Sequence, residues 1–214
     1  MDEDITIINS KTRNERIKNF FITNKKKVIS IFVTLIIIIF SFYSYQIYKN
    51  KHVERLSNKY NTTVIEYENG DQNKTILSMK ELINDKNRTY SPLALYFLID
   101  NDLINDQQEV NKLFDILIEK TRLENEIRNL AIYKKALFNS DFNSENDLLK
   151  ILNPIINSES IWKSHSLYLL AEYFYSKNEK QKSKEFFNQI LMLKNSNKDI
   201  KIETQKRLNR DFSE

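Results

Sequence analysis

The chain has 214 residues, a formal net charge of +4, no Cys, one Gly and two Pro. Without Cys it has neither a disulfide framework nor a thiolate metal site, and one Gly is too few for a phosphate-binding loop. An all-β sandwich or barrel is also disfavoured, because such folds need many turn-forming residues. The composition therefore favours an all-α fold.

Residues 1–27 form a short, polar, basic tail. Ile17, Phe20 and Phe21 are spaced as one face of a short helix. This spacing indicates either a helix on anionic headgroups or a basic flank with incidental apolar residues, and the second interpretation is preferred. The basic residues gather beside the next stretch, so no nucleic-acid partner is predicted.

Residues 28–48 are an apolar stretch without charge, Gly or Pro. About 20 such residues in a helix span the roughly 30 Å hydrocarbon core of a bilayer. Tyr43, Tyr45 and Tyr48 gather at one end, as aromatic rings do at the headgroup level. A cleaved signal peptide would have a shorter apolar run followed by small residues. One uncleaved transmembrane helix is therefore predicted. Lys25–Lys27 before it predict a cytoplasmic N-terminus and a C-terminal region outside the cytoplasm.

Residues 49–69 are predicted to extend this helix. Apolar residues recur at steps of three and four, which is helical periodicity. They are Val53, Leu56, Tyr60, Val64 and Tyr67. Gly70 suits the position just after a helix ends.

Residues 70–214 show only helical patterns, separated by polar breaks such as Asn84–Ser91, Asn139–Asn146 and Lys177–Asn178. Pro92 suits the first turn of a helix, whereas Pro154 is expected to disturb the end of one. Helices of about 12–17 residues joined by short turns predict helical hairpins.

An internal repeat is visible as two sets of five residues separated by 35 positions. The first set is Ile132, Ala136, Leu148, Leu152 and Ile155, and the second is Leu167, Ala171, Ser183, Phe187 and Ile190. A period near 34 residues is typical of tetratricopeptide repeats, in which small residues lie at close helix crossings and large ones between hairpins. A single N-terminal transmembrane helix followed by a tetratricopeptide-like α-solenoid is predicted. The alternative is an irregular bundle whose apolar stripes coincide.

Two stretches carry a family resemblance. One is Asn14–Phe21 followed by Lys25–Lys27, and the other is Leu152–Ile155 leading to Ile161–Lys163 and Ala171. On these the chain resembles bacterial inner-membrane tetratricopeptide-like proteins, a family that includes the ancillary subunit of the SecYEG translocon. The resemblance implies a periplasmic domain acting as a scaffold near the translocon or periplasmic chaperones, with no catalytic residue.

No catalytic, cofactor or metal site is predicted. His52 and His165 have no Cys or carboxylate at ligand spacing. Trp162 and six tyrosines either line a binding face or simply pack, and packing is preferred. An excess of basic residues over 177–210 either steers a partner or is solvated surface.

The predicted function is a membrane-anchored protein-interaction scaffold that faces the periplasm. Its partners would be translocon subunits, chaperones or exported proteins. Two alternatives stay open: a permanently bound structural subunit of another membrane complex, and an enzyme with an unrecognised site.

Overall fold

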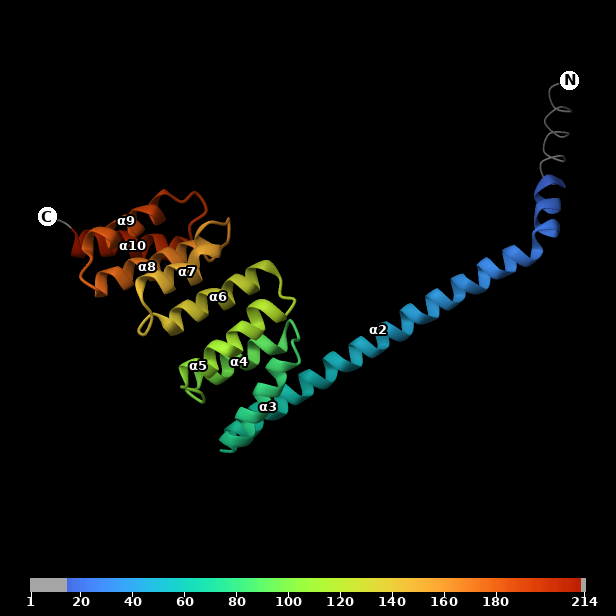
Figure 1. Cartoon of the computed structure of the whole chain (residues 1–214), viewed down its shortest axis with the longest axis horizontal. Helices are drawn as coiled ribbons and strands as arrows, with labels where there is room; N and C mark the ends of the chain where they lie inside the picture. The colour runs from blue at the N-terminus through green and yellow to red at the C-terminus, as the bar shows by residue number, and fades with distance from the viewer. Residues whose placement is uncertain (1–14, 213–214) are drawn as a thin grey trace, which may run out of the picture. The chain divides into compact units, whose positions relative to one another are not determined.

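The computed structural model describes residues 15–212, and all regular structure within that range is helical. The all-α prediction is therefore confirmed for these residues. The chain divides into two compact units, Met1–Arg55 and Leu56–Glu214. Figure 1 shows the helices from the blue N-terminal end to the red C-terminal end. Their bounds are α2 Lys25–Glu68, α3 Gln72–Asn84, α4 Tyr90–Asp100, α5 Gln107–Asp115, the π-helical η1 Ile116–Lys120, α6 Asn125–Asn139, α7 Glu145–Ile156, α8 Lys163–Ser176, α9 Lys180–Met192 and α10 Lys198–Asp211.

Helix α2 is long and apolar enough to cross a membrane. It has 44 residues, and its apolar window of 18 residues has a mean hydropathy of 2.3 with none of it buried. Phe32, Ile38 and Phe40 are 65%, 62% and 69% exposed. Leaving apolar surface in water costs about 25 cal/mol per Å², so hydrocarbon is the solvent that suits this surface. The sequence prediction of one candidate membrane-spanning helix near the N-terminus is confirmed at this level.

The last turns of α2 belong to the second compact unit. Leu56 is 1% exposed, and Tyr60 and Val64 pack against the same buried cluster. The Lys59 ammonium pairs with the Glu81 carboxylate on α3. Helix α2 is thus apolar on all sides in its membrane-length part and amphipathic in its last turns. Only one face of those last turns packs against the protein core.

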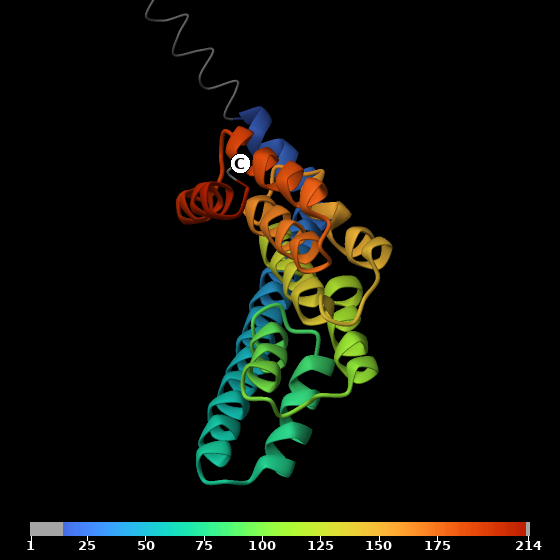
Figure 2. The same ribbon diagram turned by 90° about the vertical axis from the view of Figure 1, so that its left-hand side faces the viewer.

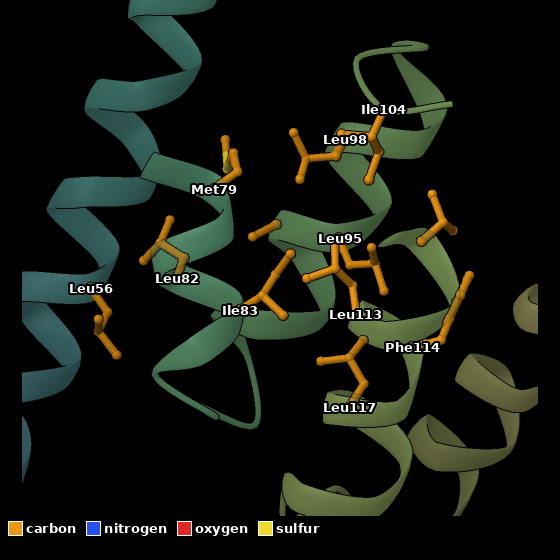
Figure 3. Packing of buried hydrophobic residues seen from close by; sticks show 12 residues of the cluster. Leu56, Met79, Leu82, Ile83, Leu95, Leu98, Ile104, Leu113, Phe114 and Leu117 are labelled. Atoms are coloured by element: carbon orange, nitrogen blue, oxygen red, sulfur yellow. The ribbon is translucent and has the colours of Figure 1, made fainter. Parts of the chain in front are cut away.

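The largest buried cluster joins the end of α2 to α3, α4, α5 and η1. Figure 3 shows its side chains converging from these helices. Its buried members are Leu56, Met79, Leu82, Ile83, Ala94, Leu95, Leu98, Ile104, Val110, Leu113, Phe114 and Leu117. Periodic apolar residues on each helix supply this core, as the sequence pattern predicts.

Two further clusters occupy the C-terminal half. One lies among α6, α7 and α8, and the other joins α8 to α9 and α10. From α5 onward, each helix packs on the helices next to it in the chain, and Figure 2 shows this order from green to red. Helical hairpin arrays and up-and-down bundles share such packing, so helix order alone does not establish a solenoid.

Polar side chains cap the start of several helices. The carboxylate of Asp71 accepts a hydrogen bond from the Lys74 amide at 3.2 Å, and that of Asp106 accepts one from the Glu109 amide at 2.7 Å. Ser144 caps α7 in the same way, which starts that helix inside the predicted loop Asn139–Asn146. Such caps satisfy amides that have no partner within the helix.

Left-handed residues end several helices. Gly70 has φ +90° after α2, and three other residues adopt positive φ without being glycine. They are Lys86 at 53°, Asp102 at 51° and Asn178 at 62°. After α8 the amides of Asn178 and Glu179 donate to the carbonyls of Tyr175 and Phe174, which is the Schellman pattern. A chain with one glycine must place other residues at these positions.

The two prolines and the π-helical segment each set a local boundary. Pro92 lies in the first turn of α4, as predicted, although α4 begins inside the predicted break. The side chain of Asn87 accepts from the Thr89 and Tyr90 amides and allows this earlier start. Pro154 lies inside α7, which ends two residues later. The π-helical η1 was not predicted, since its apolar spacing resembles that of an α-helix.

Candidate functional site

All ten residues predicted for repeat packing are buried. The first set lies in one cluster between α6, α7 and α8. Four of the second set lie in the next cluster, and the fifth, Ser183, is buried on α9. The structure therefore gathers each set within its own hairpin. The equivalence of the two hairpins as repeats stays a prediction.

A groove with mainly apolar walls lies between α4 and α6. Its volume is about 530 Å³. The α4 side consists of Thr89, Pro92, Leu93 and Tyr96, which follow steps of three and four and so share one face of the helix. The α6 side consists of Glu124, Ile127 and Leu130 at steps of three, and Arg88 precedes α4. We call this feature the α4–α6 groove.

Two large apolar side chains in the α4–α6 groove face solvent. Leu93 is 42% exposed and Ile127 is 40% exposed, one on each wall. Pro92, which also lines the groove, is buried. Exposed apolar side chains that face each other across a groove provide a surface for the apolar residues of a ligand.

Charged residues lie at both ends of the α4–α6 groove. Arg88 and Glu124 lie where α4 and α6 begin. At the other end the Lys134 ammonium lies 3.4 Å from the Asp100 carboxylate and 4.6 Å from the centre of the Tyr96 ring. The groove is therefore an apolar strip with charged residues near both ends.

The hydroxyl of Tyr96 is buried and has no hydrogen-bond partner among the described residues. Burial, followed by the nearby Asp100 carboxylate, raises the pKa of Tyr96, so the hydroxyl keeps its proton. A buried donor without a partner costs about 1–3 kcal/mol. This unpartnered donor belongs to Tyr96, which lines the α4–α6 groove.

Of the groove residues, sequence reasoning named only Tyr96 as a possible part of a binding face, and it preferred packing for most of that group of aromatic residues. A signal was available in α4, which carries apolar residues on every face. Ala94, Leu95 and Leu98 already fill the core side, so Leu93 is apolar without a packing need. A short helix with more apolar residues than its core contact requires is the pattern to look for.

A second hollow, of about 490 Å³, lies among α5, η1, α6 and α7, and most of its lining residues are polar. At its base Asn139, which is 1% exposed, accepts from Gln107 at 3.1 Å and exchanges hydrogen bonds with Asn111 at 2.9 and 2.8 Å. Lys135 pairs with Asp115 at 2.6 Å. These groups satisfy one another, so they link α5 to α6 rather than await a ligand.

The two histidines lie in unrelated surroundings. The His165 ring packs 5.1 Å from that of Trp162 and 6.0 Å from that of Tyr133, and burial lowers the pKa of His165. His52 Nδ1 lies 3.2 Å from a guanidinium nitrogen of Arg55. Across residues 15–212 no group of three or more His, Cys, Asp or Glu is placed to hold a metal ion.

Aromatic side chains of the second unit pack against other rings. Trp162 stacks on Tyr133 with ring centres 5.8 Å apart, and Tyr173 packs edge-on to Phe174 at 5.6 Å. Tyr173 is 7% exposed and its hydroxyl donates to the Asn143 carbonyl at 3.1 Å. These contacts favour packing for them, which leaves Tyr96 as the tyrosine of the α4–α6 groove.

Many basic residues near the C-terminus are paired. Arg207, with a side chain 11% exposed, donates to both carboxylate oxygens of Glu172 at 2.7 and 2.6 Å and also pairs with Asp211. Lys182 contacts Glu145 at 2.9 Å and Glu179 at 2.8 Å. These pairs tie α10 to α8 and α9 to α7. Of the ten basic residues over 177–210, four form such ion pairs with described residues, so both interpretations of the basic excess stay open.

Comparisons with protein families, with curated proteins and with solved structures find no match for this chain. Function is therefore inferred from the apolar helix, the groove and the charges. The groove and the apolar part of α2 both expose apolar side chains that do not pack against other described residues.

Proposed function

We propose that the chain is a single-pass protein of a bacterial inner membrane whose helical domain binds other proteins outside the cytoplasm. Helix α2 supplies the candidate span. Lys25–Lys27 precede its apolar part and support a cytoplasmic N-terminus by the positive-inside rule. Residues 56–214 are then the part available to partners in the periplasm.

The single observation that carries the binding role is the exposure of Leu93 and Ile127 on opposite walls of the α4–α6 groove. Its occupant in this proposal is a short segment of another protein with apolar side chains at its centre and polar groups at its ends. The groove has this same order, with apolar walls between Arg88 at one end and the Lys134–Asp100 pair at the other. Complementary polar ends would set the register of the segment.

The partner class follows from the family resemblance. Residues 14–21 with the lysines after them, and residues 152–155 with 161–163, resemble inner-membrane tetratricopeptide-like proteins. We propose translocon subunits, periplasmic chaperones or exported proteins as the partners. An anchor keeps the domain in a thin layer above the membrane, which raises its effective concentration toward such partners.

Orientation is tested by reporters fused after Glu214 of the full chain. A reporter that is active only outside the cytoplasm should be active, because the lysines before the span retain the N-terminus inside. A cytoplasm-only reporter should be silent at the same position. A reversed pair of signals would refute the proposed orientation.

Partner binding is tested with a photoreactive amino acid placed at Leu93 or Ile127 of the full chain in living cells. Translocon subunits or exported proteins should be captured at both positions. Ile202 on α10 is the matched control, because it is apolar and 46% exposed but does not line the groove. Leu93→Glu or Ile127→Glu should abolish capture from the other wall, whereas Ile202→Glu should not.

The anchor by itself provides a further control. If residues 1–69 capture the same partners as the full chain, binding occurs within the bilayer and the groove is not the recognition surface. Capture that requires residues 71–214 but survives both groove substitutions would place the interface elsewhere on the domain. Such a result would favour a permanently bound subunit, which uses a larger surface.

A further inference from the structure

Residues 15–23 are helical, and a turn at Asn24 separates this described segment, which we call the short helix, from α2. The side chain and the amide of Asn24 both donate to the Phe20 carbonyl, at 3.1 and 2.9 Å. Figure 1 shows the ribbon changing direction where this short helix meets α2. Because of this turn, the axis of the short helix does not continue the axis of the candidate span.

One face of the short helix is apolar and uncovered. Ile17, Phe20 and Phe21 are 50%, 60% and 52% exposed, and they fall on one side at steps of three and four. The two phenyl rings pack edge-on with centres 5.9 Å apart. Asn19 lies 200° around the helix from Ile17, so it marks the opposite, polar side.

Basic residues border this apolar face. Arg16 and Lys18 flank Ile17 at about 100° on either side, and Lys25–Lys27 follow directly after the turn. Long basic side chains at the edge of an apolar face reach outward to phosphate groups while their stems stay on apolar surface. Ile22 is the one large apolar residue that lies off this face, next to the turn.

We infer that residues 15–23 lie flat on the membrane leaflet that α2 enters, with Ile17, Phe20 and Phe21 among the acyl chains and with Arg16 and Lys18 on anionic phospholipid headgroups. The occupant of the apolar face is lipid because the face begins a few residues from the candidate span, which places it at the headgroup level. The flanking charges match an anionic surface. The inference rests on the proposed crossing of the membrane by α2. Of the two interpretations of the basic tail, the inference favours a helix on anionic headgroups over a basic flank with incidental apolar residues.

The test uses the full chain, which contains no Cys and so accepts a single labelled one. Ile17→Cys, Asn19→Cys and Ile38→Cys each carry an environment-sensitive fluorophore, and each protein is reconstituted into phosphatidylcholine vesicles with or without phosphatidylglycerol. A nitroxide on the lipid and iodide in the water serve as competing quenchers. The label at position 17 should shift to the blue and be quenched by the lipid nitroxide, whereas the label at position 19 should be quenched by iodide.

Anionic lipid should matter as well. The blue shift at position 17 should be larger with phosphatidylglycerol than without it. Arg16→Gln with Lys18→Gln should remove that difference, because the flanking charges would be gone. Lys49→Gln with Lys51→Gln is the matched control at the other end of the apolar stretch and should leave the difference intact.

The label at Ile38 separates this inference from the proposal on which it rests. Lipid quenching at position 38 with equal iodide quenching at 17 and 19 would overturn the surface helix and leave the span standing. Lipid quenching at both 17 and 19 would show a fully inserted segment and also overturn it. Iodide quenching at position 38 would refute the span itself.

Discussion

At the scale of single residues, two tyrosines offer a matched comparison. The buried hydroxyl of Tyr96 has no partner, whereas that of Tyr173 donates to the Asn143 carbonyl. Tyr96→Phe should leave the free energy of unfolding unchanged or raise it, because it removes a buried donor that has no partner. Tyr173→Phe should lower it by about 0.5–1.5 kcal/mol. Urea unfolding of both variants measures the difference, and equal losses would mean that Tyr96 also has a partner in solution.

A second residue-scale prediction concerns the left-handed Lys86 at the end of α3. Lys86→Gly should stabilise the domain by about 0.5–1 kcal/mol, because glycine adopts positive φ without steric cost. The control is Lys150→Gly on the exposed side of α7, which should destabilise by about 1 kcal/mol because glycine is a poor helix former. The same chemical change should therefore act with opposite signs at the two sites. Two losses of similar size would argue against the left-handed conformation at Lys86.

At the scale of elements, the hairpins α6–α7 and α8–α9 depend on small residues in their cores. Ala136 and Ala171 are fully buried. Ala136→Leu or Ala171→Leu should each lower the free energy of unfolding by roughly 1–3 kcal/mol, because added methylenes force neighbouring side chains apart. Gln181→Leu on the exposed side of α9 introduces the same leucine side chain where no neighbours crowd it, and it should change little. Unchanged melting temperatures for both alanine variants would remove the predicted repeat register.

At the scale of the whole molecule, α2 serves both compact units, so the folded domain should depend on its last turns. A fragment of residues 50–214 keeps Leu56, Tyr60 and Val64 in the core, whereas a fragment of 71–214 lacks them. The loss of Leu56 alone resembles a Leu→Ala change, which costs about 2–5 kcal/mol. The shorter fragment should therefore unfold at a clearly lower urea concentration. Equal midpoints would mean that the domain core begins after Gly70.

The sequence by itself determined the features that depend on local patterns. An unbroken apolar run identifies the candidate span, and helical periodicity indicates the helices from α3 to α10 without fixing their bounds, although it does not identify η1. Ala136 and Ala171 could be assigned to the core because they recur among large apolar residues at helical steps. The αL end at Lys86 carried no such signal, because lysine does not favour positive φ.

Only the tertiary structure decided how faces far apart in the sequence meet. Leu93 and Ile127 form one groove because α5 returns the chain and sets α6 beside α4. The repeat register predicted from the sequence covers only residues 132–155 and 167–190, so it did not relate Leu93 to Ile127. The pairing of Arg207 with Glu172 has the same origin. Periodicity reports which face of a helix is apolar, whereas the partner of that face depends on loop geometry and side-chain packing, which are not local properties of the chain.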